Sequence, residues 1–151
     1  MNYLLDTNIL LAYLNKSKLS GFVDQTYQPL NGQNQVGISI VTPGELMSIS
    51  LQSNWGQARH LKLQALIQAF NVIDINIDAI LRYYAEIDVF SQGKLIGKPL
   101  GASARNMGKN DLWIAATANY VEATLLTTDK DFNHLNGHFL DVVWLNPDEF
   151  K

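Results

Sequence analysis

Short apolar runs that alternate with helical segments constrain the fold of this chain more than any other feature. The runs expected to form strands cover residues 2–5, 35–41, 71–75, 123–128 and 140–145. The helical patterns between them cover residues 7–15, 42–54, 56–70, 78–90 and 110–121. Strands that are apolar on both faces and separated by helices are typical of a parallel sheet with helices on either side. We therefore expect an α/β fold with three layers, αβα, around a central, mostly parallel sheet of four to five strands. The pattern does not give the strand order.

The composition fits one folded domain, which we expect to span residues 1–151. Apolar residues make up 47% of the chain, enough for a packed core. No run of ~18 apolar residues occurs, so no membrane span is expected. The first residues lack the basic region of a secretory signal. The chain has no cysteine, which excludes disulfides and thiolate metal sites and fits the reducing cytoplasm, where we place the protein. The net charge of -3 neither indicates nor excludes a nucleic-acid partner.

Four acidic residues occupy comparable places in this pattern. Asp6 directly follows the first expected strand, and Asp129 directly follows the run 123–128. Glu45 and Asp111 each lie in the first turn of an expected helix. Ligands of open parallel sheets gather outside the carboxyl ends of the strands. All four carboxylates could therefore face one edge of the sheet.

Each of these acids also has a structural interpretation. Thr42 and Glu45 match a capping box, with Thr42 as the N-cap of the helix, which is worth ~1 kcal/mol. Asp111 near a helix start gains from the helix dipole. Asp6 and Asp129 could each cap the segment that follows. A single acid of this kind is more often a cap than a catalyst, so the case for a site depends on the four together.

Four converging carboxylates need a positive partner. Two charges ~4 Å apart repel each other by about 1 kcal/mol in water and by more near a protein surface. Without a partner, their pKa values would rise until one or more took up a proton. No lysine or arginine adjoins Asp6 or Glu45. Oxygen ligands without cysteine favour Mg²⁺ or Mn²⁺, and Mg²⁺ commonly completes its shell with phosphate oxygens. The pattern therefore points to phosphoester chemistry.

The segments around the four acids resemble the motifs of a known family. They read LLDTNILLAYL (4–14), ISIVTPGEL (38–46), NDLWIAATA (110–118) and LLTTDKDF (125–132). Their order and spacing are similar to those of the PIN domain, and within it to VapC-type toxins of bacterial toxin–antitoxin pairs. The likeness extends from about residue 2 to residue 145. One such motif alone would be weak, whereas four in order are a specific signal.

The resemblance implies a PIN-like fold and an endoribonuclease that hydrolyses RNA phosphodiester bonds with Mg²⁺ or Mn²⁺. It assigns the catalytic and metal-binding positions to Asp6, Glu45, Asp111 and Asp129. Asp6 and Asp111 would be the main ligands, while the other two acids would hold metal-bound water or a second ion. The number of ions stays open. Supporting polar residues are expected at Thr7, Asn8, Asn110 and either Thr127 or Thr128.

A basic connection precedes the third acid. Residues 89–110 contain no acidic residue and carry four basic ones: Lys94, Lys98, Arg105 and Lys109. The connection is longer than in many members of the family it resembles. It is either a solvated surface loop or an electrostatic guide for the RNA backbone, and the two interpretations are compatible.

Several other residues receive a structural interpretation. Asp131 is assigned to the turn after Asp129 rather than to the metal site. His134 and His138 have a spacing that suggests metal binding, but the Asn–Gly between them breaks the helical geometry such a pair needs, so no zinc site is expected. The three tryptophans are expected in the core or at an interface rather than under nucleic-acid bases: Trp55, Trp113 and Trp144. Trp113 is expected to point inward.

Two other functions compete with the ribonuclease. A PIN scaffold without activity could bind metal or a protein partner, but the complete acidic set argues against it. A phosphate-handling domain would need paired acids after the first strand or a glycine-rich loop, and the sequence offers neither.

The resemblance also implies partners. A VapC-type toxin is expected to bind a small cognate antitoxin that lays a helix in an apolar groove and places a basic residue at the acids. The amphipathic helices between residues 42 and 70 are candidates for that groove and for the contacts of a homodimer.

Overall fold

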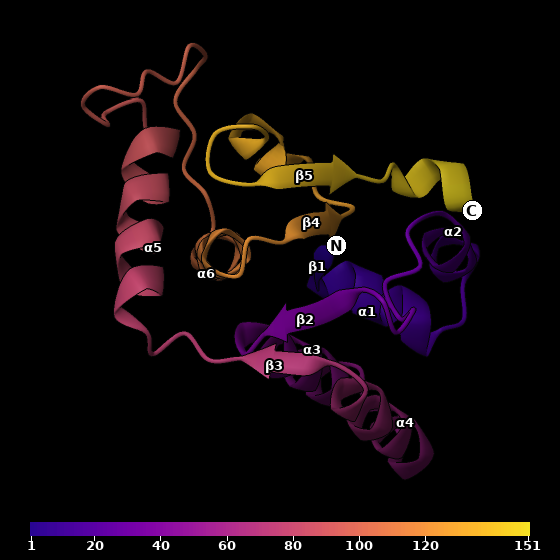
Figure 1. Ribbon diagram of the computed structural model, residues 1–151. Coiled ribbons are helices and arrows are strands. Elements are labelled where there is room, and N and C mark those ends of the chain that lie inside the picture. Colours follow the sequence, from indigo (N-terminus) through magenta and orange to yellow (C-terminus); the bar gives the residue numbers. More distant parts are fainter.

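The computed structural model describes residues 1–151 and contains one parallel sheet of five strands (Figure 1). The strands are β1 (Asn2–Leu5), β2 (Gln35–Ser39), β3 (Asn71–Ile73), β4 (Thr124–Thr127) and β5 (Asp141–Trp144). Their order is β3-β2-β1-β4-β5, and every neighbouring pair is parallel. The predicted parallel sheet is confirmed, with each strand within two residues of its expected ends.

Helices cover both faces of this sheet. They are α1 (Thr7–Leu14), α2 (Lys18–Thr26), α3 (Val41–Gln52), α4 (Gln57–Gln68), α5 (Asp78–Ser91) and α6 (Lys109–Tyr120). Two 3-10 helices follow, η1 (Lys130–Leu135) and η2 (Pro147–Phe150). One apolar core joins a face of the sheet to α5, α6 and η1, and a second joins the opposite face to α1, α2, α3 and α4. The expected three layers are confirmed.

The two cores divide the strand residues in alternation. Leu4 of β1 lies in one core, while its neighbours Tyr3 and Leu5 lie in the other. In β4, Leu125 and Leu126 likewise point to opposite faces. Successive strand residues alternate between faces, so a strand buried on both sides must be apolar throughout. This requirement explains the continuous apolar runs in the sequence.

The strand order places a topological switch point between β1 and β4. From β1 the chain adds β2 and β3 on one side, and then crosses to add β4 and β5 on the other (Figure 1). Leu5 at the end of β1 lies in register with Leu126 of β4. Because connections leave in opposite directions here, the carboxyl ends of these two strands border the crevice where open α/β sheets bind ligands.

The start of α3 differs from the prediction. The helix begins at Val41 with Ile40 as its N-cap, so Thr42 does not cap it and the expected capping box with Glu45 is wrong. Thr42 is fully buried, and its hydroxyl lies 3.3 Å from that of Thr7. The Thr42 hydroxyl therefore contacts α1 and is not used to cap α3.

Two helical features were not foreseen. Residues 18–26 form α2, for which the sequence pattern predicts no helix. In α4 the buried residue is Leu63, whereas Leu61, expected on the apolar face, is 57% exposed. Leu63 shares its core with Leu66, Ile67 and Phe70, so the buried face of α4 is rotated from the predicted one.

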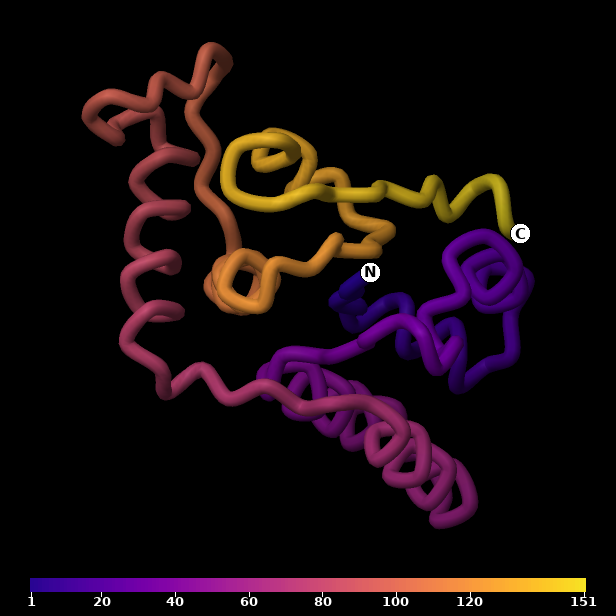
Figure 2. Tube along the Cα trace, in the orientation of Figure 1, coloured from indigo at the N-terminus to yellow at the C-terminus, as the bar shows by residue number.

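The connection between α5 and α6 forms a long loop without helix or strand. Figure 2 shows it running beyond the end of α5 before it returns toward α6. It is fastened at its return, where the backbone N–H of Arg105 donates to the carbonyl of Ser91 at 2.7 Å. The structure contains no helix with the length and apolar character needed to cross a membrane.

Candidate functional site

Asp6 lies at the junction of β1 and α1, next to the end of β4. Its backbone N–H donates to the carbonyl of Leu126 at 3.1 Å, which extends the strand pairing by one residue. One carboxylate oxygen, Oδ1, accepts from the backbone N–H of Thr7 at 2.7 Å and caps α1. The other, Oδ2, accepts from the hydroxyl of Thr127 at 2.6 Å. The cap and the possible site ligand are therefore the same side chain.

Burial sets the ionisation of Asp6. Its side chain is buried, and desolvation raises its pKa to about 6 although the hydrogen bonds from Thr127 and Thr7 lower it. Repulsion from Glu45 and Asp129 adds to the rise. The interaction with both residues places three of the expected acids within electrostatic reach of one another.

Glu45 reaches this edge from α3. The hydroxyl of Thr7 donates to Oε1 of Glu45 at 2.8 Å. This contact joins the first turns of α1 and α3, because Thr7 is the first residue of α1 and Glu45 lies one turn into α3. The side chain predicted as part of a capping box is thus held toward Asp6 by the residue that follows Asp6.

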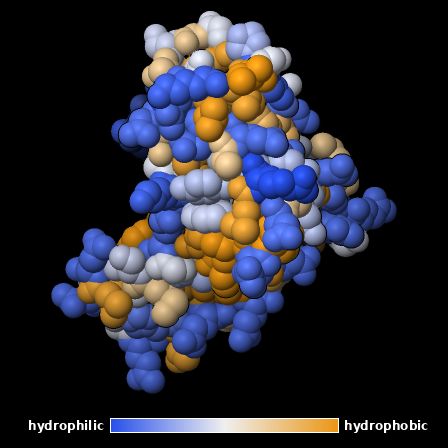
Figure 3. Space-filling model, turned by 90° about the vertical axis from the view of Figure 1, so that its left-hand side faces the viewer, coloured by the Kyte–Doolittle hydropathy of each residue, from blue (hydrophilic) through white to orange (hydrophobic).

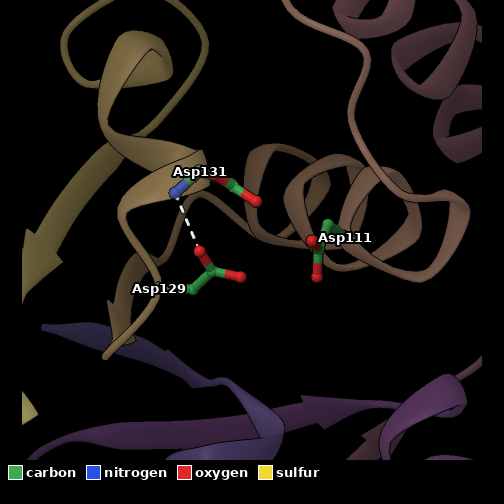
Figure 4. Close-up of side chains that lie close together, drawn as sticks. All are labelled: Asp111, Asp129 and Asp131. Atoms are coloured by element: carbon green, nitrogen blue, oxygen red, sulfur yellow. Dashed lines mark hydrogen bonds between the residues drawn. The ribbon is translucent and has the colours of Figure 1, made fainter.

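Three further carboxylates form the densest part of the site. Asp111, Asp129 and Asp131 each place an oxygen within 4.8 Å of the others, and Figure 4 shows them converging from α6 and from the start of η1. Asp129 caps η1, since its Oδ1 accepts from the backbone N–H of Asp131 at 2.9 Å. That turn directs both side chains of the Asp-Lys-Asp sequence toward α6.

Asp111 has the most strongly shifted pKa of these acids. Desolvation and then repulsion by its neighbours raise its pKa to about 7. The four repelling carboxylates, in order of effect, belong to Asp6, Asp129, Glu45 and Asp131. The other four acids therefore all raise the pKa of Asp111, and none of the five forms a salt bridge.

The donor set fits a hard divalent cation. Every contributing atom is a carboxylate oxygen, and neither cysteine nor histidine belongs to the group. Ligands that share one Mg²⁺ at ~2.1 Å lie no more than ~4.2 Å apart. Oxygens within 4.8 Å of one another would reach such an ion after small side-chain rotations or through a water. A cation would also relieve the repulsion that raises these pKa values.

Comparison with known proteins agrees with this geometry. A family model described as PIN domain matches residues 3–137, a range that covers most of the chain and contains the five acids. The chain belongs to the PIN domain family. Among curated relatives, this PIN domain is 30% identical over 145 residues to Ribonuclease VapC1 of Haemophilus influenzae strain R2866, covering 95% of the chain and 96% of the relative.

Solved structures of toxin–antitoxin complexes share the fold of this PIN domain. One is VapBC2 from Rickettsia felis bound to a DNA fragment from their promoter, with 25% identity, a TM-score of 0.74 and coverage of 97% of this chain and 100% of that one. Another is VapBC-1 from nontypeable Haemophilus influenzae, with 26% identity, a TM-score of 0.70 and coverage of 95% and 98%. The PIN-like, three-layer fold is thereby confirmed over nearly the whole chain.

The structure brings the four acids named from the sequence to one edge of the PIN domain, and their roles as ligands stay a prediction. It also adds a fifth. Asp131 was assigned to the turn, but it takes part in the turn through its backbone and in the acidic group through its side chain. The signal was the spacing of two residues in Asp-Lys-Asp, which a tight turn can direct to one side.

The supporting polar residues differ in what they contact. Of the two candidates at the end of β4, Thr127 holds Asp6, and Thr128 instead accepts from Asn8 at 3.1 Å. The Thr128 hydroxyl thus contacts Asn8, while the contact to a carboxylate is made by Thr127. Asn110 is exposed and lines a cavity of about 520 Å³ beside Glu45, and its side chain holds no acid.

The four basic residues of the loop are not equivalent. Arg105 lines a cavity of about 220 Å³ together with Asp131, next to the acids. Lys98 is engaged elsewhere, because its Nζ donates to the carbonyl of His138 at 2.8 Å and lies 4.0 Å from the ring centre of Phe139. Lys94 and Lys109 are exposed. Of the four, Arg105 alone lines a cavity together with one of the acids.

The histidine and tryptophan side chains have distinct surroundings. Nε2 of His134 lies 2.7 Å from the hydroxyl of Ser91, which joins η1 to the end of α5. Burial lowers the pKa of His134, with Arg105 contributing. Trp113 packs inward against Tyr84, with ring centres 4.2 Å apart, as expected.

Proposed function

We propose that this PIN domain is a VapC-type toxin, an endoribonuclease that hydrolyses RNA phosphodiester bonds with Mg²⁺ or Mn²⁺. The observation that carries the proposal is the convergence of five carboxylates at the switch point of the sheet. Relatives that cover nearly the whole chain at about 30% identity are named as VapC1 ribonucleases, which supports the choice of RNA.

The acids divide into a buried and an open group. Asp6 would hold the ion from the floor of the crevice, where Thr127 and the start of α1 fix its two oxygens. Asp111 and Asp129 would hold it from the two sides, with Asp131 beside them. Such an ion, when bound, lowers the pKa of water and stabilises negative charge on a phosphate.

The remaining side chains position water and the polynucleotide. Thr7 holds Oε1 of Glu45, which leaves Oε2 to orient a water for in-line attack. Arg105, across a small cavity from Asp131, would bind a backbone phosphate. The polar crevice supplies no serine, cysteine or lysine in a nucleophile–base pair, so water is the attacking group in this proposal.

The proposal includes protein partners in the cytoplasm. The solved relatives are complexes of a VapC with its VapB, and we propose a cognate antitoxin for this chain also. Exposed apolar side chains on α3 and α4 are candidates for its contacts: Met47, Leu51 and Leu61. Figure 3 shows apolar surface on the side of α5 and β3, where Leu81 and Val72 are exposed, and this surface would serve a homodimer.

The decisive test compares RNA cleavage by two matched variants. Purified protein is incubated with a mixed RNA pool in Mg²⁺, in Mn²⁺ or in EDTA, and new RNA ends are sequenced. Asp111→Asn should abolish cleavage, whereas Asp141→Asn, an exposed acid at the start of β5, should retain it. Cleavage that persists in EDTA, or in folded Asp111→Asn protein, would overturn the proposal. Mn²⁺ binding without cleavage would favour an inactive scaffold.

A further inference from the structure

A second open space adjoins the acids on the side of β5. It is a groove of about 730 Å³ that begins at Asp129 and Asp131 and extends past Trp144 to the start of η2. Its lining combines the apolar side chains of Leu19, Trp144 and Pro147 with polar ones that include Asn8 and Asn146. A chain bound across the acids would continue into this groove.

Trp144 is held in a fixed orientation in that groove. Its indole N–H donates to the carbonyl of Thr128 at 3.0 Å, so the ring is fastened to the residue directly before Asp129. The ammonium of Lys130 lies 5.2 Å from the ring centre, and Lys130 is exposed. One face of the half-buried ring is therefore covered by the exposed side chain of Lys130, which a base stacking there would displace.

The polar groups around Trp144 suit the edge of a nucleobase. Nδ2 of Asn8 uses one hydrogen bond on Thr128, and Oδ1 of Asn146 accepts from the backbone N–H of Asp148. Each amide keeps at least one N–H for a ligand, because a primary amide carries two. An aromatic face flanked by amide donors offers both stacking and hydrogen bonding to a base.

Lysine side chains lie over the Trp144 ring and near the far end of the groove, among the carboxylates of Asp129, Asp131 and Asp148 that line it. Lys130 stands between Asp129 and Asp131, and Lys151 pairs with Asp148 at 2.9 Å at the far end of the groove. Nζ of Lys18 donates to the carbonyl of Lys151 at 3.1 Å. These three lysines lie outside the basic loop selected from the sequence, and they can follow a phosphate backbone that passes over Trp144.

We infer that this groove binds one nucleotide of single-stranded RNA beside the cleaved phosphate, with its base stacked on Trp144. The inference rests on the proposed function for the identity of the polymer. It makes Trp144 a determinant of RNA binding rather than of the chemical step. Stacking tolerates any base, so the groove contributes affinity and position more than sequence selection.

Binding and cleavage are measured separately so that the two proposals can fail independently. In the Asp111→Asn background, a fluorescein-labelled single-stranded hexaribonucleotide is titrated in Mg²⁺ and followed by anisotropy. Trp144→Leu, which keeps apolar bulk, should weaken binding about tenfold, the loss of one stacked base. Trp144→Phe, which keeps a ring, should stay within about threefold. Trp55→Leu, a tryptophan beside Arg59 on another surface, is the control and should bind normally.

The outcomes separate the two proposals. Equal affinity of folded Trp144→Leu and the Asp111→Asn parent would overturn the inference, whatever the wild-type protein cleaves. If Trp144→Leu weakens binding but the wild-type protein cleaves no RNA, the RNA-binding role of the groove is supported and the proposed ribonuclease activity is refuted. In cleavage-competent protein, Trp144→Leu should raise KM about tenfold and leave kcat nearly unchanged. A loss confined to kcat would contradict a binding role.

Discussion

The hydroxyl of Thr127 donates a 2.6 Å hydrogen bond to Oδ2 of Asp6, and so joins the ends of β4 and β1 beneath the acidic cluster. Thr127 is fully buried, and its oxygen also accepts from the backbone N–H of Asp129 at 3.0 Å. One hydroxyl thus orients the side chain of one acid and the backbone of another. The geometry of the proposed metal site depends on this contact.

Thr127→Val should weaken metal binding while the protein remains folded. The substitution keeps the shape and removes the donor, so the pKa of Asp6 rises further and its carboxylate loses its orientation. We expect the Kd for Mn²⁺ to increase about tenfold or more, as for other residues that orient metal ligands. The lost hydrogen bond to a charged group should cost about 1.5–3 kcal/mol in unfolding free energy.

Isothermal titration calorimetry with Mn²⁺ measures this change in Kd, and a second buried threonine provides the control. Thr117 is also fully buried, and its hydroxyl donates to the carbonyl of Trp113 within α6. Thr117→Val should therefore lower stability without changing Mn²⁺ affinity. Equal metal affinity of the two variants would contradict the role given to Thr127.

The raised pKa values of Asp6 and Asp111, about 6 and about 7, predict how stability depends on pH without metal. Because both exceed the unfolded value of ~3.9, the folded state binds more protons than the unfolded state in this range. The contribution of these groups to the unfolding free energy should therefore fall as pH rises from about 4 to 7. Saturating Mg²⁺ should restore stability at pH 8 and have little effect at pH 5.

The variant Asp111→Asn measures how much the charge of Asp111 lowers the stability of the metal-free protein. In EDTA at pH 8 the variant should unfold at a higher temperature than wild-type protein, and the difference should vanish near pH 4. We expect a gain of about 1 kcal/mol, reduced from the full shift because Asp111 is partly exposed to solvent. Thermal unfolding at both pH values checks this. A variant less stable than wild type at pH 8 would show that the acids do not repel as described.

Arg105 and Lys98 both lie in the basic loop, but their substitution should affect RNA binding and stability differently. Arg105→Ala should weaken single-stranded RNA binding several-fold and reduce the slope of log K against log salt by about 0.7, because one phosphate contact is lost. Lys98→Ala should leave that slope unchanged and lower stability, since Lys98 holds the carbonyl of His138 and covers Phe139. Binding titrations at several salt concentrations would distinguish them, and identical slopes for both variants would refute this assignment.

Local sequence patterns predicted the layers of this fold because strand burial and helix periodicity are local properties. The strand order was not predictable in the same way, since it depends on pairings such as Leu5 with Leu126, which are distant along the chain. The cap assigned to Thr42 was wrong for a related reason. Its hydroxyl faces Thr7, which lies 35 positions earlier, and this contact replaces the expected local one.

The candidate site shows the same division between local and distant information. The places of Asp6, Glu45, Asp111 and Asp129 follow from strand ends and helix starts. The contribution of Asp131 depends on how the turn after Asp129 directs its side chain toward α6. Trp144 was expected in the core or at an interface, yet it lines a groove, because its position on the last strand lies next to Asp129 only once β5 pairs with β4.

The five carboxylates are proposed to form one divalent-cation site, and a crystal structure of the protein with Mn²⁺ would show whether they do. An anomalous difference map from data recorded at the manganese absorption edge distinguishes the ion from water and from lighter ions. We predict a peak at the carboxyl ends of β1 and β4, with oxygens of Asp111, Asp129 and Asp6 bound directly or through one water. If crystals saturated with Mn²⁺ show no peak at this end of the sheet, or a peak only elsewhere, the carboxylates do not form the proposed cation site.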